Sequence, residues 1–286
     1  MSQKQKLTKL GRILCCMARN PRGTFDYFSQ MPESIRGRAF GKLYRHLQKR
    51  TNNSSHINIT SSPISINPLT RFFDNHAVGR GIWKWDHYFD IYHTHFSKFV
   101  GKRINILEIG VYSGGSLEMW REYFGDKCRV YGVDIAEICK AYNNEHTEIF
   151  IGDQAERRFW RDFTAKVPQI DILLDDGGHT YNQQIVTLEE MLPHINPGGV
   201  YVCEDIHGTN NGFNSYCQGL IKNLNEMTPF DPEVGAKAGM QPNLLQAWIE
   251  GIYFYPFMTV IAKAERPIEK LIAPRRGTLW QPINTT

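Results

Sequence analysis

The sequence predicts an α/β fold in which helices cover both faces of a mostly parallel sheet. The first observation is that short β-rich runs alternate with helical patterns. The β-rich runs span residues 104–109, 130–133, 149–151, 170–174 and 200–203, and the helical patterns lie near 116–124, 155–165 and 181–194. This alternation indicates strand–helix–strand units, whose right-handed crossovers place helices on both faces of the sheet. The other two observations are a glycine-rich turn after the first strand and acidic residues at the ends of later strands.

Four segments are expected along the chain. Residues 1–67 are predicted to form a basic helical extension that ends in a linker rich in Asn, Ser and Thr. Residues 68–100 form an aromatic helical segment, which we expect to pack on the main domain. That domain is assigned to residues 101–270, and residues 271–286 form a C-terminal tail.

Within the main domain, a turn at 197–199 (Pro-Gly-Gly) is expected to precede the fifth strand. An irregular stretch at 207–246 includes one helix near 216–227. Two β runs in 251–263, with Pro256 at the bend, are predicted to add an antiparallel hairpin to the sheet edge. His93 and His95 point to different sides of a helix, which argues against a metal site in the aromatic segment.

Charge is distributed unevenly. Residues 1–50 hold twelve Lys or Arg against Asp26 and Glu33, a net charge of +10, so the chain's total of +4 leaves −6 for the other residues. A basic arm predicts an acidic partner such as an anionic membrane surface, nucleic acid or another subunit, whereas a solvated helical face is the alternative. We expect peripheral membrane contact and a homo-oligomer, and no specific nucleic-acid recognition.

Composition predicts a cytoplasmic protein. The six cysteines form no Cys-x-x-Cys pair, which disfavours zinc binding and a disulfide framework and favours free thiols in a reducing compartment. The apolar run at 13–18 is too short for a signal peptide, and no run approaches the roughly 18 apolar residues that cross a bilayer.

The ends of the first three strands predict a nucleoside cofactor. The first strand leads into Glu-x-Gly-x-x-x-Gly-Gly, which includes Glu108, Gly110 and Gly114 and lacks the Gly-x-Gly-x-x-Gly that fits a pyrophosphate. A carboxylate at Glu108 suits a cofactor with an ammonium group, and Asp134 can accept both ribose hydroxyls. Asp153 and Gln154 could meet an adenine edge. Helix caps and turns are the alternative interpretation of these residues.

The fourth and fifth strands end in a second cluster, with Asp175, Asp176 and His179 after one and Glu204 and Asp205 after the other. Crowded carboxylates repel each other unless a cation offsets them, and oxygen ligands favour a hard ion such as Mg²⁺. A histidine beside such an ion can remove a proton from a hydroxyl group. The alternative is that the Asp pair caps the helix near residue 180 and that the Glu-Asp pair merely ends a strand.

These motifs resemble those of the class I S-adenosylmethionine-dependent methyltransferases, over roughly residues 85–263, and the resemblance implies a Rossmann-like sheet of seven strands. It implies that Glu108, Gly110 and Gly114 line the methionine end of the cofactor and Asp134 the ribose, and that Ser116 also binds the cofactor. It places Asp153 and Gln154 at the adenine, with Asp175 also in the cofactor site.

The run Asp-Asp-Gly-Gly-His, with Glu-Asp on the next strand, is similar to that of the mycinamicin and demethylmacrocin sugar O-methyltransferases. This likeness implies that Asp176, Glu204 and Asp205 bind Mg²⁺ and that His179 is the general base. Gly178 stands where the family usually has Ser, which puts fine substrate orientation in doubt. The cephalosporin-hydroxylase-like proteins share much of this fold, so the likeness alone leaves the reaction open.

The sequence therefore predicts a magnesium-dependent O-methyltransferase that acts on a sugar hydroxyl of a glycosylated natural product or glycan. Two alternatives are an oxidoreductase with a nicotinamide cofactor on the same sheet and a non-catalytic nucleoside-binding subunit. The acceptor pocket is expected to include residues 68–100 and 207–246, neither of which carries a motif that identifies the acceptor.

Overall fold

The computed structural model describes residues 67–227 and 239–274, together with a few positions within 32–41 and 276–277. The chain divides into two compact units, Met1–Ile64 and Ser65–Thr286. Most of the predicted basic extension, including Cys15 and Cys16, lies outside the described residues. Within the described part of the chain, no helix is both long enough and apolar enough to cross a membrane.

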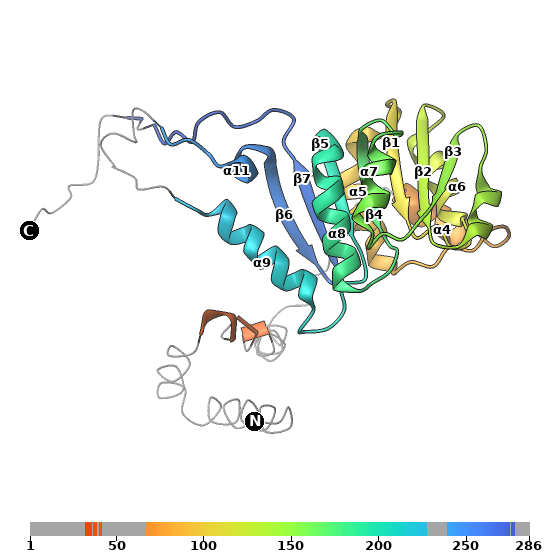
Figure 1. Cartoon of the computed structure of the whole chain (residues 1–286), viewed down its shortest axis with the longest axis horizontal. Coiled ribbons are helices and arrows are strands. Elements are labelled where there is room, and N and C mark those ends of the chain that lie inside the picture. Colours follow the sequence, from red (N-terminus) through yellow and green to blue (C-terminus); the bar gives the residue numbers. More distant parts are fainter. Residues whose placement is uncertain are drawn as a thin grey trace, which may run out of the picture. The chain divides into compact units, whose positions relative to one another are not determined.

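The second unit is built on a seven-stranded sheet of order β3-β2-β1-β4-β5-β7-β6 (Figure 1). The strands are β1 Ile104–Ile109, β2 Cys128–Asp134, β3 Thr147–Ile151, β4 Ile170–Asp175, β5 Ile195–Cys203, β6 Ile249–Tyr255 and β7 Met258–Lys263. Strands β1 to β5 pair in parallel, and β7 pairs antiparallel with both β5 and β6. The predicted fold class, a mostly parallel sheet with an edge hairpin, is confirmed.

One turn was predicted wrongly. Residues 197–199 do not precede the fifth strand but lie inside β5, whose pairing with β4 shifts register between Ile170 and Ile172. Gly198 adopts a φ of +76°. Glycine accommodates this left-handed conformation without breaking the strand, so the Pro-Gly-Gly sequence makes an irregularity in the ladder and not an end.

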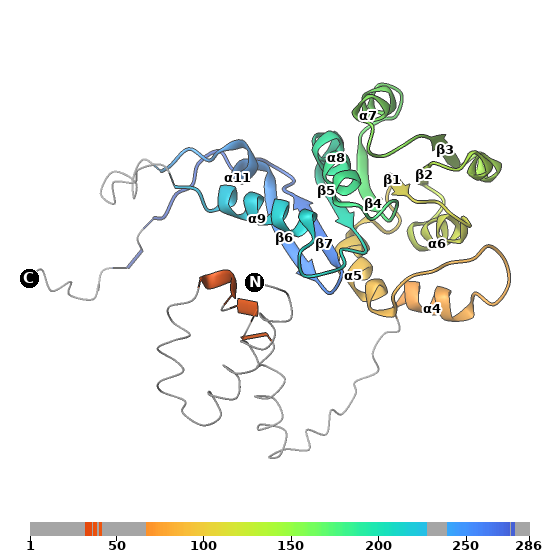
Figure 2. The same cartoon turned by 60° about the horizontal axis from the view of Figure 1, so that its bottom comes forward.

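Helices cover both faces of the sheet. The helices described in the second unit are α4 Pro68–Asn75, α5 Asp86–Phe96, α6 Gly115–Phe124, α7 Arg157–Thr164, α8 Tyr181–Met191, α9 Gly212–Leu224 and α11 Leu244–Trp248, with short 3-10 turns η1 Ser97–Phe99, η2 Glu137–Tyr142 and η3 Leu192–His194. Side chains alternate along β1, so that Ile106 joins the core under α4, α5 and α6 while Leu107 joins the core under α7, α8 and α9. Figure 2 shows α6 and α7 on opposite sides of the sheet.

The aromatic segment packs against the sheet as part of the same unit. Asn67 caps α4 by accepting a hydrogen bond from the Leu69 amide, and Pro68 begins the helix. In α5, Phe89, Tyr92 and Phe96 are buried. The segment between these helices passes close to the start of α6, where the carbonyl oxygen of Arg80 lies 2.2 Å from the place of a β-carbon on Gly115, and residues 81–85 line the same pocket as the strand ends. Residues 81–85 therefore reach the cavity described next.

Candidate active site

A cavity of about 830 Å³ opens at the carboxyl ends of β1, β2, β4 and β5. Ligands of parallel α/β sheets gather at this edge, and the volume is within the range of small-molecule sites. The predicted site residues that line it are Glu108, Gly110, Ser116, Asp134, Asp153, Gln154, Asp176, His179, Glu204 and Asp205. Gly114 and Asp175 do not line it.

The glycine-rich turn brings β1 against the end of β4. Gly110 has a φ of +87°, and a β-carbon there would lie 2.1 Å from the carbonyl oxygen of Asp176. Only glycine fits this close approach. Gly114, with a φ of +76°, forms the N-cap of α6 and shapes the turn from outside the cavity wall. On either side of this cap, Ser113 and Ser116 line the cavity.

Glu108 lies at the cavity floor with 1% of its surface exposed. It accepts hydrogen bonds from Ser116 Oγ at 2.7 Å and from Trp120 Nε1 at 3.2 Å. Burial raises the pKa of this carboxyl, although the charge of Lys84 and the Ser116 hydrogen bond act in the opposite direction. The carboxylate is therefore oriented by two donors and is a suitable partner for a buried cation.

Asp134 and Asp153 lie at the ends of the next two strands. Asp134 accepts from the backbone amides of Tyr112 at 3.0 Å and Ala136 at 2.8 Å, so its carboxylate is held at the rim of the cavity. Asp153 accepts from the amide of Ala155 at 2.8 Å. Three consecutive strand ends thus present the polar groups that the sequence predicted for a nucleoside.

Asp175 faces away from the cavity. Successive side chains of a strand point to opposite faces, so Asp175 lies behind the wall that Asp176 helps to form. It accepts from Gln154 Nε2 at 2.9 Å and from Tyr201 Oη at 3.2 Å, and Gln154 Oε1 in turn accepts from the Gly178 amide at 2.6 Å. This placement favours a supporting role for Asp175, which holds Gln154, over contact with the cofactor.

Burial raises the pKa of the Asp175 carboxyl to about 6, against the hydrogen bonds from Gln154, the Gly177 amide and Tyr201, which lower it. The folded state keeps a proton that the unfolded state loses, so stability falls as pH rises from about 4 to about 6. We expect Asp175→Asn to raise the free energy of unfolding at pH 8, by at most roughly 3 kcal/mol, and to change it little at pH 4. Urea unfolding with EDTA at both pH values would check this. An equal change at pH 4 and pH 8 would contradict it.

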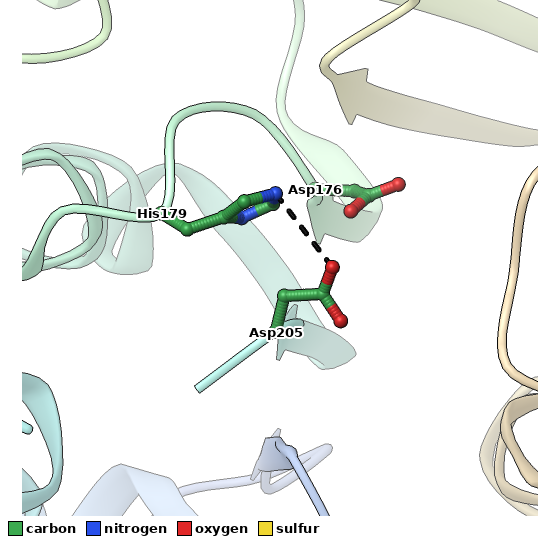
Figure 3. A group of neighbouring side chains, drawn as sticks. All are labelled: Asp176, His179 and Asp205. Carbon is green, nitrogen blue, oxygen red and sulfur yellow. Dashed lines mark ion pairs between the residues drawn. The ribbon is translucent and has the colours of Figure 1, made fainter. Parts of the chain in front are cut away.

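Asp176, His179 and Asp205 come together in a group that could hold a metal ion (Figure 3). One ligand atom from each lies within 4.8 Å of the others, and His179 Nε2 is 3.6 Å from Asp205 Oδ2. The helix-capping alternative for the Asp pair is wrong, because Thr180 itself caps α8 in a capping box with Gln183. The carboxylate of Asp176 is therefore not used as a helix cap.

Sequence reasoning missed Lys84. Its side chain is 3% exposed, and Nζ lies 2.6 Å from Asp176 Oδ2, 3.1 Å from Glu204 Oε2 and 3.6 Å from Glu108 Oε1. Burial lowers the pKa of Lys84, but the three carboxylates outweigh burial and raise it above its ordinary range. Lys84 is thus a charged ammonium between Glu108 on one side and Asp176 and Glu204 on the other.

Glu204 makes different contacts from Asp176 and Asp205, the two residues with which it was predicted to bind a metal ion. The carboxylate is buried and accepts hydrogen bonds from Lys84 and from the Tyr92 hydroxyl, so it does not belong to the three-residue group of Figure 3. Burial raises its pKa, while the charge of Lys84 lowers it. The only sequence signal for Lys84 was a lysine between two tryptophans in the aromatic segment, Trp83 and Trp85.

Comparisons with known proteins agree with this geometry. The family model for the methyltransferase domain matches residues 107–206. The chain is 34% identical over 139 residues to an 8-demethyl-8-alpha-L-rhamnosyl tetracenomycin-C 2'-O-methyltransferase of Streptomyces olivaceus, covering 46% of this chain and 36% of that protein. It is 27% identical over 221 residues to a demethylmacrocin O-methyltransferase of Streptomyces fradiae, covering 71% and 54%.

Among solved structures, the methyltransferase MycE of the mycinamycin biosynthetic pathway, in complex with Mg and SAH, superposes with a TM-score of 0.56. The two are 25% identical, and the match covers 74% of this chain and 57% of MycE. The match with this chain spans 36% of the length of the tetracenomycin-C relative and 54% of the length of the demethylmacrocin relative.

Proposed function

Because the chain is a class I methyltransferase related to the macrolide sugar O-methyltransferases, we propose that it methylates a sugar hydroxyl of a glycosylated small molecule or glycan. The methyl donor would be S-adenosylmethionine. The observation that carries this proposal is the juxtaposition, in one cavity, of a nucleoside-type wall around Glu108 and Asp134 with the group of Asp176, His179 and Asp205. Donor and acceptor would meet between these two halves.

The residues of the cavity wall suit the cofactor. Glu108 would bind the ammonium group of its methionine end, beside Ser116 and the turn formed by Gly110 and Gly114. Asp134 would accept from the ribose hydroxyls, and Asp153 and Gln154 would contact the adenine, with Asp175 keeping Gln154 in place. A carboxylate such as Glu108 would repel a pyrophosphate, which disfavours the nicotinamide alternative.

The acidic cluster suits a magnesium ion. We assign Asp176, Glu204 and Asp205 as its ligands, as the family resemblance implies. Asp176 and Asp205 already lie together, whereas Glu204 would have to exchange its hydrogen bond from Lys84 for the ion. Even with Lys84 offsetting one charge, the cluster and Glu108 keep an excess of negative charge for a divalent cation. Bound there, Mg²⁺ would orient an acceptor hydroxyl and make it more acidic.

His179 would supply the base. Its Nε2, on the cavity wall next to Asp205, would take the proton of the acceptor hydroxyl, and Asp205 would stabilise the resulting imidazolium. As the oxygen–methyl bond forms, the sulfur–methyl bond breaks, and the electron pair stays on sulfur to give S-adenosylhomocysteine. Alignment of the two reactants in one cavity would provide much of the acceleration.

Calorimetric titration with S-adenosylhomocysteine, with and without Mg²⁺, tests the cofactor assignment, and an NADH titration serves as the comparison. Methyl transfer from labelled S-adenosylmethionine to a panel of rhamnosides, analysed by mass spectrometry, tests the acceptor class, since one relative is named for a rhamnosyl substrate. We expect S-adenosylhomocysteine to bind and NADH not to bind. Binding of NADH alone would overturn the proposal.

A further inference from the structure

Three aromatic rings form a half-exposed platform beside Asp205. The ring centroids of Trp85 and Phe257 are 5.3 Å apart, those of His207 and Phe257 are 4.9 Å apart, and those of Trp85 and His207 are 6.3 Å apart. Trp85 and His207 line the cavity, and Trp85 remains 47% exposed and Phe257 40% exposed. We call these three residues the aromatic platform. Large aromatic surface left open beside a polar cluster is typical of a binding site.

Phe257 adopts a backbone conformation that disfavours its own side chain. It is the second residue of a two-residue turn between β6 and β7, since Tyr255 pairs with Met258, and its φ is +62°. After a proline at the first turn position, here Pro256, this second position normally takes Gly or Asn. Because the Phe257 ring is only partly buried, its packing offsets little of this backbone strain. Strain of this kind concentrates at functional sites.

The turn is held firmly against the end of β5. The Phe257 carbonyl accepts from the Ile206 amide at 2.9 Å, and the Tyr88 hydroxyl lies 3.2 Å from that carbonyl and 2.9 Å from Asp205 Oδ1. Asp205 itself has a φ of +53°. Two left-handed residues that are not glycine therefore meet here, and Tyr88 contacts both. The fold fixes Phe257 and Asp205 relative to each other.

We propose that the aromatic platform is the acceptor subsite and that it binds the apolar face of a pyranose ring. Trp85 Nε1 donates to Asp205 Oδ1 at 3.1 Å, which places a carboxylate oxygen at the edge of the platform. Because the rings of Trp85 and Phe257 are tilted by 43° to each other, a sugar would stack one face on Trp85 and contact Phe257 with its edge, with its C–H groups toward the rings and its hydroxyl groups toward Asp205. This combination of an apolar face and a hydroxyl edge is what distinguishes a pyranose from a flat phenol. The inference rests on the proposed function and specifies its substrate class.

The strain at Phe257 makes the inference testable. Phe257→Gly removes the ring and relieves the strain, whereas Phe257→Ala removes the ring and keeps the strain. We expect Phe257→Gly to melt at or above the wild-type temperature, and both variants to lose about fivefold in sugar affinity, as for loss of an aromatic contact. The matched control is Phe254→Ala, since Phe254 is 48% exposed on the same hairpin, whereas only Phe257 of the two has ring contacts with Trp85 and His207.

The probe is methyl α-L-rhamnopyranoside, and binding is measured by saturation-transfer NMR with S-adenosylhomocysteine and Mg²⁺ present. We expect wild type and Phe254→Ala to transfer saturation to the ring C–H protons and both Phe257 variants to transfer much less. The inference would be overturned if the Phe257→Gly variant showed unchanged saturation transfer to the sugar or a clear drop in melting temperature. It would also be overturned if the wild type showed no saturation transfer. Calorimetric titration of the same samples with S-adenosylhomocysteine tests the proposed function separately. If the proposed function is wrong, S-adenosylhomocysteine will not bind, whereas if only the acceptor subsite is wrong, it will still bind.

Discussion

Replacement of Lys84 by methionine is expected to lower the free energy of unfolding by about 3–5 kcal/mol at pH 7, the cost of breaking a buried ion pair. Methionine has a similar length, so packing changes little, but Glu108, Asp176 and Glu204 lose the cation that lies within 3.6 Å of each. Two of these carboxyls are 1% exposed and cannot turn to water. Urea unfolding measures the loss, with Lys102→Met, at an exposed position, as the control.

The pH dependence separates this effect from a packing defect. Without Lys84, the pKa values of the buried carboxyls rise further, and a raised folded-state pKa gives stability that is lost as pH increases. The defect of the Lys84→Met protein should therefore be larger at pH 8 than at pH 5. Mg²⁺ should restore more stability to this variant than to the wild type, because the cation replaces the missing charge. A loss that is the same at both pH values would show that Lys84 acts through packing alone.

Replacement of His179 by alanine is expected to lower kcat by about 10²–10⁴-fold, the usual contribution of a general base. The side chain is 42% exposed and its ion pair with Asp205 is long, so we expect the unfolding transition to remain near that of the wild type. Affinity for S-adenosylhomocysteine should also remain, since no hydrogen bond joins His179 to Glu108 or Asp134. Steady-state methyl transfer and calorimetry on the same preparation measure both quantities.

His207→Ala is the comparison variant, because His207 Nε2 also lies beside Asp205, at 3.7 Å from Oδ1. We expect it to raise KM through the aromatic platform and to leave kcat close to the wild-type value. Full methyl transfer by His179→Ala would exclude His179 as the base, although the class of enzyme would be unaffected. A comparable loss of kcat in the His207→Ala variant would indicate that His207 is the general base.

Much of the site could be predicted because parallel strands end at one edge of the sheet. The spacing around Gly110 indicated the tight turn. The structure shows why glycine is needed there, because the carbonyl oxygen of Asp176 lies too close to Gly110 for a β-carbon. The carboxylates of Asp176 and Asp205 follow neighbouring strands, so their proximity follows from strand order. The wrong turn at 197–199 has a local cause, because glycine and proline also occur in strand irregularities.

The sequence by itself predicted the fold class, the sheet edge expected to bind a cofactor and the acidic cluster. These predictions rest on hydrophobic periodicity, strand ends and turn glycines, which are local patterns of a few residues. Only the tertiary structure decided which distant groups join that cluster. Lys84 meets carboxylates 92 and 120 positions away. The strained Phe257 ring likewise reaches Trp85 and His207 through a hairpin folded against β5. Such contacts depend on how whole elements pack, and no local pattern encodes the packing partner of a single side chain.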